Sequence, residues 1–208
     1  MNTTRRSAGL GLLVYGLGTA VAFMSTGSPG GDYEDSTVAA YTDTGHWPVV
    51  AALAYLGAFS ALAFLAFAGR MRNELGDRGD LFWGLSVAGT AAAVVGWMLV
   101  AGIQIAFAEG GAAVTALPHP VIYMLSEMSN LVAVCASALL IGTAAIVLAT
   151  KATLPTPARY TTYAAGAFGI IAPAFFPLFL FWLWAIGMGG WLAMSDRSAA
   201  LAPHPQLA

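Results

Sequence analysis

The feature that most constrains this chain is a series of long apolar stretches that are almost free of charge. Five segments have this character, and short polar connections separate them: residues 8–25, 47–69, 82–108, 120–150 and 163–194. A helix needs about 20 mostly apolar residues to cross the ~30 Å hydrocarbon core of a bilayer. The sequence therefore predicts five transmembrane helices, with six as an alternative if the long last segment crosses twice.

Composition supports a membrane protein. Of the 208 residues, 59% are hydrophobic and only 9% are charged, whereas an ordinary soluble domain is ~25% charged. So few charged side chains cannot coat a water-soluble globule of this size. They also argue against a disordered chain, a coiled coil or a nucleic-acid-binding protein. The expected partner is the lipid bilayer, with no role for nucleic acid.

The basic residues predict the orientation. Seven of the eight Lys and Arg residues fall on one side of the predicted spans. They are Arg5, Arg6, Arg70, Arg72, Arg78, Lys151 and Arg159. Because loops rich in Lys and Arg stay in the cytoplasm, we expect an inner (plasma) membrane protein with its N-terminus inside. An odd number of spans then places the C-terminus outside, with Arg197 as the one basic residue on that side.

The whole chain is expected to form an all-α unit. Residues 1–198 are predicted to make one five-helix transmembrane bundle, and residues 199–208 a flexible tail. Small residues recur every four positions in the third span, where helices can approach closely: Gly84, Ala88, Ala92 and Gly96. This stripe predicts a helix-packing interface, within the chain or with another chain.

The fifth segment combines prolines with many aromatic residues. Pro173 and Pro177 are four residues apart and predict a kink or a break, because each removes a backbone hydrogen bond. Aromatic residues follow them: Phe179, Phe181, Trp182, Trp184 and Trp191. We favour an aromatic belt at the outer membrane interface, with a groove for a lipid or quinone-like molecule as the alternative.

A polar group lies within the fourth span. Glu127 is the one ionisable side chain well inside a predicted span, and such residues are candidates for function. Asn130 and Ser126 lie within one helical turn of it, and Gln104 lies at a similar depth in the third span. We expect these four residues to form a ligand-binding or proton-binding site near the outer face.

Two histidines and two acids are expected at the same outer end. His46 and His119 begin the second and fourth spans, and Asp43 and Glu109 lie at similar depth. Imidazole and carboxylate groups suit a transition metal, so a metal or haem site is a hypothesis here. The residues form no metal-binding motif, and the favoured prediction is that the protein has no cofactor.

Some short sequences resemble a known group of proteins. They are Ser28-Pro29, Val38-Ala39-Ala40-Tyr41, Gly69-Arg70-Met71-Arg72, and the acid-to-Asn pattern from Glu127 to Asn130. The layout resembles uncharacterised five-span membrane proteins of high-G+C bacteria. The resemblance implies a membrane topology and no particular activity.

These observations favour a non-enzymatic protein without catalytic residues. The expected function is an accessory or scaffold subunit that joins other membrane proteins, or further copies of itself, through helix–helix contacts. One alternative is a small transporter or lipophilic-ligand-binding protein, with its site around Glu127 open to the outside. Another is a redox protein that binds metal or haem at the outer face.

Overall fold

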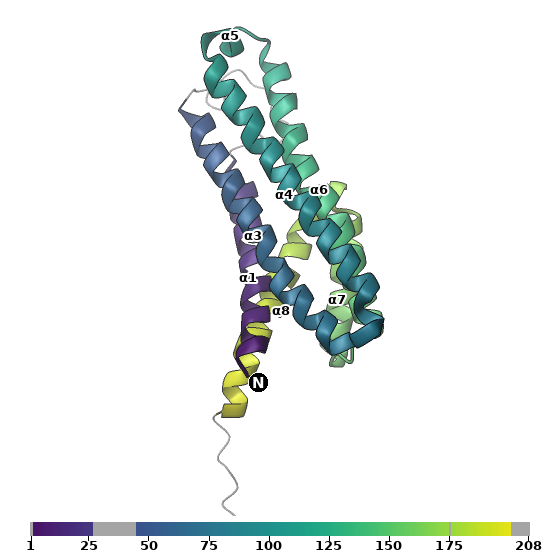
Figure 1. The fold of residues 1–208 in the computed structure, drawn as a ribbon. Coiled ribbons are helices and arrows are strands. Elements are labelled where there is room, and N and C mark those ends of the chain that lie inside the picture. The colour runs from purple at the N-terminus through teal and green to yellow at the C-terminus, as the bar shows by residue number, and fades with distance from the viewer. Residues whose placement is uncertain (1, 27–44, 175, 201–208) are drawn as a thin grey trace, which may run out of the picture.

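The computed structural model describes residues 2–26, 45–174 and 176–200, and within these residues the protein is all-α (Figure 1). The α-helices are α1 (Asn2–Met24), α3 (His46–Leu75), α4 (Asp80–Gly110), α5 (Ala112–Thr115), α6 (His119–Lys151), α7 (Thr156–Ile170) and α8 (Phe176–Ala200). Two short 3₁₀ helices connect them, η1 (Gly76–Gly79) and η2 (Ala172–Ala174). The fold is thus a bundle of long helices, as the sequence predicts.

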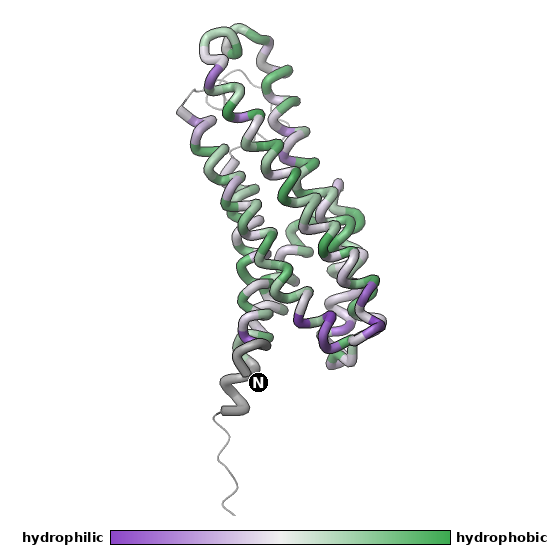
Figure 2. Tube along the Cα trace, viewed as in Figure 1, coloured by the Kyte–Doolittle hydropathy of each residue, from purple (hydrophilic) through white to green (hydrophobic). Residues whose placement is uncertain are grey.

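Several helices are suited to a membrane. The described segments that are long and apolar enough to cross one are Arg6–Met24, His46–Gly110, Pro120–Lys151 and Phe176–Met194. The second segment is 65 residues long and contains both α3 and α4, which are joined by η1. Figure 2 shows apolar residues along the helices and most hydrophilic residues near the two ends of the bundle.

Glycine and proline set the ends of the helices. Gly76 ends α3 and Gly111 ends α4, with φ values of 58° and 47°. Glycine adopts this left-handed region without the clash that a Cβ atom would cause. Pro118 and Pro155 precede α6 and α7 as their N-cap residues. The connections from α3 to α4, from α4 to α6 and from α6 to α7 are therefore short, and each long helix up to α7 runs antiparallel to the one before it.

Close contacts at glycine show this antiparallel packing. Gly18 of α1 contacts Ser60 of α3, and Gly57 of α3 contacts the ring of Trp97 in α4. Gly89 of α4 faces Ile141 of α6, and an added Cβ atom would lie 2.6 Å from the Ile141 side chain. The helices thus pack in chain order, because small residues let their backbones approach.

The structure corrects the single span predicted over residues 163–194. α7 ends at Ile170, η2 contains Pro173, and α8 begins at Phe176, with Pro177 in its first turn. Proline is tolerated in the first turn, where its missing N–H group would have no helical partner. The two prolines therefore separate a short helix from a long one.

The chain reverses direction between the end of α7 at Ile170 and the start of α8 at Phe176. α7 packs along α6, where Gly166 and Gly169 face Gly142, and α8 then packs antiparallel to α1. An added Cβ atom on Gly9 would lie 2.5 Å from the backbone nitrogen of Ala193. The start of α1 and the end of α8 therefore lie together at one end of the bundle (Figure 1). The structure does not confirm the predicted placement of the two termini on opposite sides of a membrane, and residues 201–208 lie outside the described residues.

The reversal also changes where Arg197 is expected to lie. Because Arg197 is near the end of α8, it lies at the same end of the bundle as the other seven basic residues. We call this end the basic end; it comprises the start of α1, the α3–η1–α4 turn, the α6–α7 connection and the end of α8. Residues 199 and 200, predicted as part of a flexible tail, belong to α8, and residues 201–208 lie outside the described residues.

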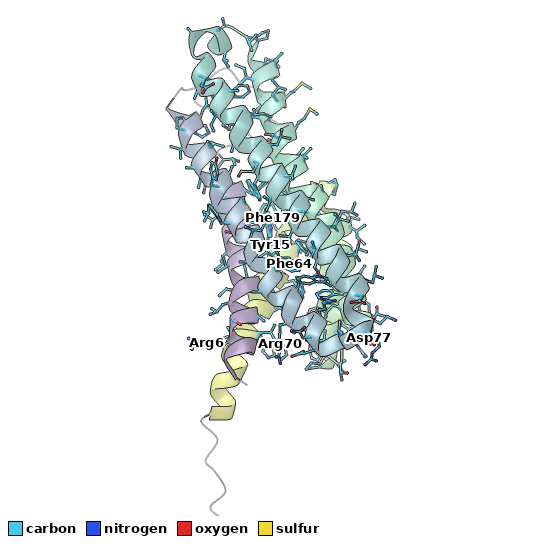
Figure 3. The ribbon with its side chains drawn as sticks, viewed as in Figure 1. Arg6, Tyr15, Phe64, Arg70, Asp77 and Phe179 are labelled. Carbon is cyan, nitrogen blue, oxygen red and sulfur yellow. The ribbon has the colours of Figure 1, made fainter. Side chains whose placement is uncertain are left out.

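An aromatic core joins α1, α3 and α8. The ring centroids of Tyr15 and Phe64 are 5.1 Å apart, and those of Tyr15 and Phe181 are 6.3 Å apart. Phe23 packs on Trp182 with centroids 5.5 Å apart. Figure 3 shows Tyr15 and Phe64 in the middle of the bundle, with Arg6 and Arg70 nearer the basic end. These contacts hold one face of α8 against the rest of the protein.

Candidate functional site

A groove with a volume of about 590 Å³ lies between α7 and α8. We call it the α7–α8 groove. Its α7 wall consists of Pro155, Pro157, Ala158, Thr161, Ala164, Ala165 and Phe168. Its α8 wall consists of Leu180, Leu183, Trp184, Gly187, Met188 and Trp191. Thr161, Trp184 and Trp191 are the lining residues with a polar atom in the side chain, and the other ten are apolar.

The groove exists because α7 and α8 contact each other less than either contacts its other neighbour. One link between the two helices is a hydrogen bond from the Trp184 indole N–H to the hydroxyl oxygen of Thr162, at 3.2 Å. Trp184 also stacks on Phe181, with ring centroids 5.9 Å apart. The α8 wall is therefore anchored to the core on one side, while the groove stays open on the other.

The aromatic residues of α8 do not form the outer-interface belt that the sequence favoured. The side chains of Phe181 and Trp182 are buried in the core, and Trp184 lies between the core and the groove. Trp191 lines the groove near the basic end. A groove for a lipid or quinone-like molecule is the alternative interpretation of this segment, and it stays a prediction.

The sequence signal for the groove was incomplete. The residues of the α7 wall are small or apolar and belong to a stretch that was predicted as the first half of a single span. Only the pair of prolines at positions 173 and 177 indicated a break. Glycine 187 gave no signal at all, although an added Cβ atom there would meet no described atom within 4 Å.

The polar residues predicted around Glu127 fall into two environments. Gln104 and Ser126 meet in the α4–α6 interface, where the Gln104 side-chain amide donates a hydrogen bond of 2.7 Å to the Ser126 hydroxyl oxygen. Asn130 is also buried, with 1% of its surface exposed. Glu127 lies at the flank of α6 and is partly exposed. The structure thus brings three of the four residues into one interface and leaves Glu127 at its edge.

Asn130 is unusual because both polar atoms of its side-chain amide are buried without a hydrogen-bond partner among the described residues. Nearby, the Ser129 hydroxyl donates to the Ser126 carbonyl oxygen at 2.7 Å. Gln104, Ser126 and Asn130 line neither the α7–α8 groove nor the smaller pocket at Leu131 and Pro173.

The residues proposed for a metal site are only partly described. A ring nitrogen of His46 lies 2.9 Å from the Thr26 carbonyl oxygen, and Glu109 is exposed near the end of α4. Asp43 lies outside the described residues, and so does the side chain of His119. Among the described side chains, no group of three His, Cys, Asp or Glu residues is arranged to hold a metal ion. A metal or haem at this end stays a hypothesis.

The small-residue stripe of the third span is split by the fold. Gly96 packs against Ala133 of α6, where any added side chain would collide with the backbone. Ala92 is half-buried, whereas Gly84 and Ala88 are exposed. An added Cβ atom on Gly84 would meet no described atom within 4 Å. The stripe is therefore not a continuous contact surface within this bundle.

Charge is concentrated at the basic end, next to the opening of the groove. Lys151 ends α6 and Arg159 lies in the first turn of α7, one residue after the groove residue Ala158. The ion pairs of the described residues join Arg70 to Glu74 at 2.7 Å and Arg72 to Asp80 at 3.2 Å. Lys151 and Arg159 belong to neither pair, and both are exposed.

The class that these features define is an all-α protein with apolar helices of membrane-spanning length. No known protein family, curated protein or solved structure matches the chain. The resemblance to five-span bacterial membrane proteins therefore stays a prediction, and the function must be argued from the site.

Proposed function

We propose that the chain is a plasma-membrane protein whose basic end faces the cytoplasm. The support is that all eight Lys and Arg residues lie at one end of the fold, as expected for a cytoplasmic face. In this arrangement α1, α3, α4, α6 and α8 each cross the bilayer, and α7 with η2 makes a sixth crossing, which brings the chain to the far side before α8 begins. α7 rises about 22 Å at 1.5 Å per residue, and η2 extends it toward the far side.

Within this topology, we propose that the protein binds a lipid-like molecule in the α7–α8 groove and carries out no chemical reaction on it. The observation that supports this function is the groove itself. Its volume of about 590 Å³ falls within the range of ~300–1,000 Å³ for small-molecule sites, and its largely apolar lining is typical of them. This proposal follows the lipophilic-ligand alternative, with the site moved from Glu127 to the α7–α8 groove.

A variant that fills the groove tests this function. Gly187→Phe places a ring in the groove from a position where a Cβ atom meets no described atom. Gly102→Phe is the matched control, because Gly102 of α4 is also exposed and has equal room for a Cβ atom. The measurement is native mass spectrometry of protein that was purified in mild detergent and then partly delipidated.

We expect the wild type and Gly102→Phe to retain a bound amphiphile and Gly187→Phe to lose most of it. Ala164→Phe, which fills the groove from the α7 wall, should act in the same way. Circular dichroism and the thermal midpoint check that each variant is folded. Equal retention in folded wild type, Gly187→Phe and Ala164→Phe would overturn the proposal.

An accessory subunit remains a second candidate, and the exposed part of the α4 stripe favours it. Gly84 and Ala88 would let a helix from another chain approach closely. Gly96 cannot be used to test such an association, because a side chain there would disrupt the bundle. The same mass spectra test this candidate with Gly84→Leu, which should remove any additional protein subunit from the wild-type complex.

A further inference from the structure

The α7–α8 groove has a length and a direction that narrow the class of its ligand. On α8 it runs from Leu180 to Trp191, and on α7 from Phe168 back to Pro157. Eleven residues of helix rise about 16 Å in each wall. This is about half of the ~30 Å hydrocarbon thickness. The groove thus matches one leaflet of a bilayer, whereas a partner's transmembrane helix would need a surface about twice as long.

The groove also has a polar end that differs from its apolar end. It begins beside the turn at residues 171–175 and ends at the basic end, near Pro155 and Pro157. Lys151 and Arg159 flank this opening in sequence, four residues before Pro155 and two residues after Pro157. Both are exposed and lie outside the two ion pairs of the described chain. The opening therefore carries positive charge that no described acidic side chain pairs with.

From this complementarity we infer that the ligand is an anionic glycerophospholipid of the leaflet at the basic end. The inference rests on the proposed function, because it assigns a headgroup to the molecule in the same groove. An acyl chain lies along Trp184, Gly187 and Trp191, and the phosphate-bearing headgroup lies at the level of Lys151 and Arg159. The apolar lining of the groove suits a single acyl chain, and the positive charge at its opening suits a negative headgroup.

The test is a competition between two lipids with identical acyl chains. Delipidated protein is incubated with equal amounts of phosphatidylglycerol, which is anionic, and phosphatidylcholine, which is zwitterionic. Native mass spectrometry then gives the ratio of the two bound lipids. A basic residue near a membrane surface attracts anionic lipid by ~1 kcal/mol, so two such residues predict at least about tenfold more bound phosphatidylglycerol.

Variants that remove positive charge test whether Lys151 and Arg159 cause the preference for phosphatidylglycerol. Lys151→Gln combined with Arg159→Gln should bring the ratio close to one while phosphatidylcholine binding persists. Arg70→Gln is the control, since Arg70 lies at the same end but is already paired with Glu74. We expect it to keep the preference. A preference that survives in the double variant, or that Arg70→Gln abolishes, would overturn the assignment of the headgroup to Lys151 and Arg159.

The result for Gly187→Phe distinguishes failure of the proposed anionic ligand class from failure of the proposed groove function. If both lipids bind equally to the wild type and Gly187→Phe removes both, the anionic class is wrong and the groove function survives. If Gly187→Phe removes neither lipid although it is folded, both proposals fail. A protein subunit or a second copy of the chain bound in place of lipid would likewise contradict both.

Discussion

At the scale of single residues, Asn130 has the least satisfied environment in the described chain. Its amide is buried, and neither its nitrogen nor its oxygen has a described hydrogen-bond partner. Leaving a buried polar group unsatisfied costs ~1–3 kcal/mol, and a membrane interior supplies no water to reduce that cost. The amide therefore weakens the α4–α6 interface unless it binds something there.

Two substitutions in the same interface, Asn130→Leu and Gln104→Leu, measure the cost of the unsatisfied amide. Asn130→Leu, which keeps the number and branching of the side-chain heavy atoms, should raise the free energy of unfolding by about 1–3 kcal/mol. Gln104→Leu should lower it by about 1 kcal/mol, because it removes the 2.7 Å hydrogen bond to Ser126. Thermal unfolding in one detergent measures both. A lower midpoint for Asn130→Leu would mean that the amide has a partner, such as a buried water molecule.

At the scale of helices, the sequence predicted four elements well, and for the fifth segment it predicted a break at the prolines but not the two separate helices α7 and α8. The predicted spans 8–25, 47–69, 82–108 and 120–150 lie within or close to α1, α3, α4 and α6. Each of these helices is separated from the next by a polar or glycine-rich connection that hydropathy detects. The turn after α7 is different, because residues Ile171, Ala172, Pro173 and Ala174 are apolar. A hydropathy profile therefore shows no boundary between α7 and α8, and it cannot show that the chain reverses direction there.

The candidate site was correspondingly harder to predict than the fold. The contact between Gln104 and Ser126 follows from their similar depth, and the sequence placed them together. The α7–α8 groove depends on the reversal at residues 171–175 and on the sparse packing between two helices. Neither property is visible in composition or periodicity. The aromatic residues of α8 were noticed, but their burial could be known only from the position of α1.

The break between α7 and α8 makes its own prediction. Pro177 lies in the first turn of α8, where proline removes no helical hydrogen bond. Pro177→Ala should therefore change the free energy of unfolding by less than about 1 kcal/mol. Ala185→Pro, in the buried interior of the same helix, should cost about 3 kcal/mol or more. Thermal unfolding compares the two variants. A strong stabilisation by Pro177→Ala would indicate that residue 177 lies inside a continuous helix instead.

At the scale of the whole molecule, the reversal explains the distribution of charge. With one span over residues 163–194, Arg197 would be the single basic residue on the outer side. With α7 and α8 antiparallel, all eight basic residues share one end, and both described ends of the chain lie there. The same reversal creates the α7–α8 groove and places its opening among basic residues. The proposed topology and the proposed ligand thus depend on one structural feature.

The most direct test of this account is the sidedness of the two chain ends. Single cysteines are introduced at Thr3, Ala113 and Ser198 in a Cys135→Ala background, and intact cells are treated with a membrane-impermeant thiol reagent. The account predicts labelling of Ala113→Cys alone in intact cells, and labelling of Thr3→Cys and Ser198→Cys only after permeabilisation. Labelling of Ser198→Cys in intact cells, with Thr3→Cys protected, would contradict the reversal and restore a single fifth span.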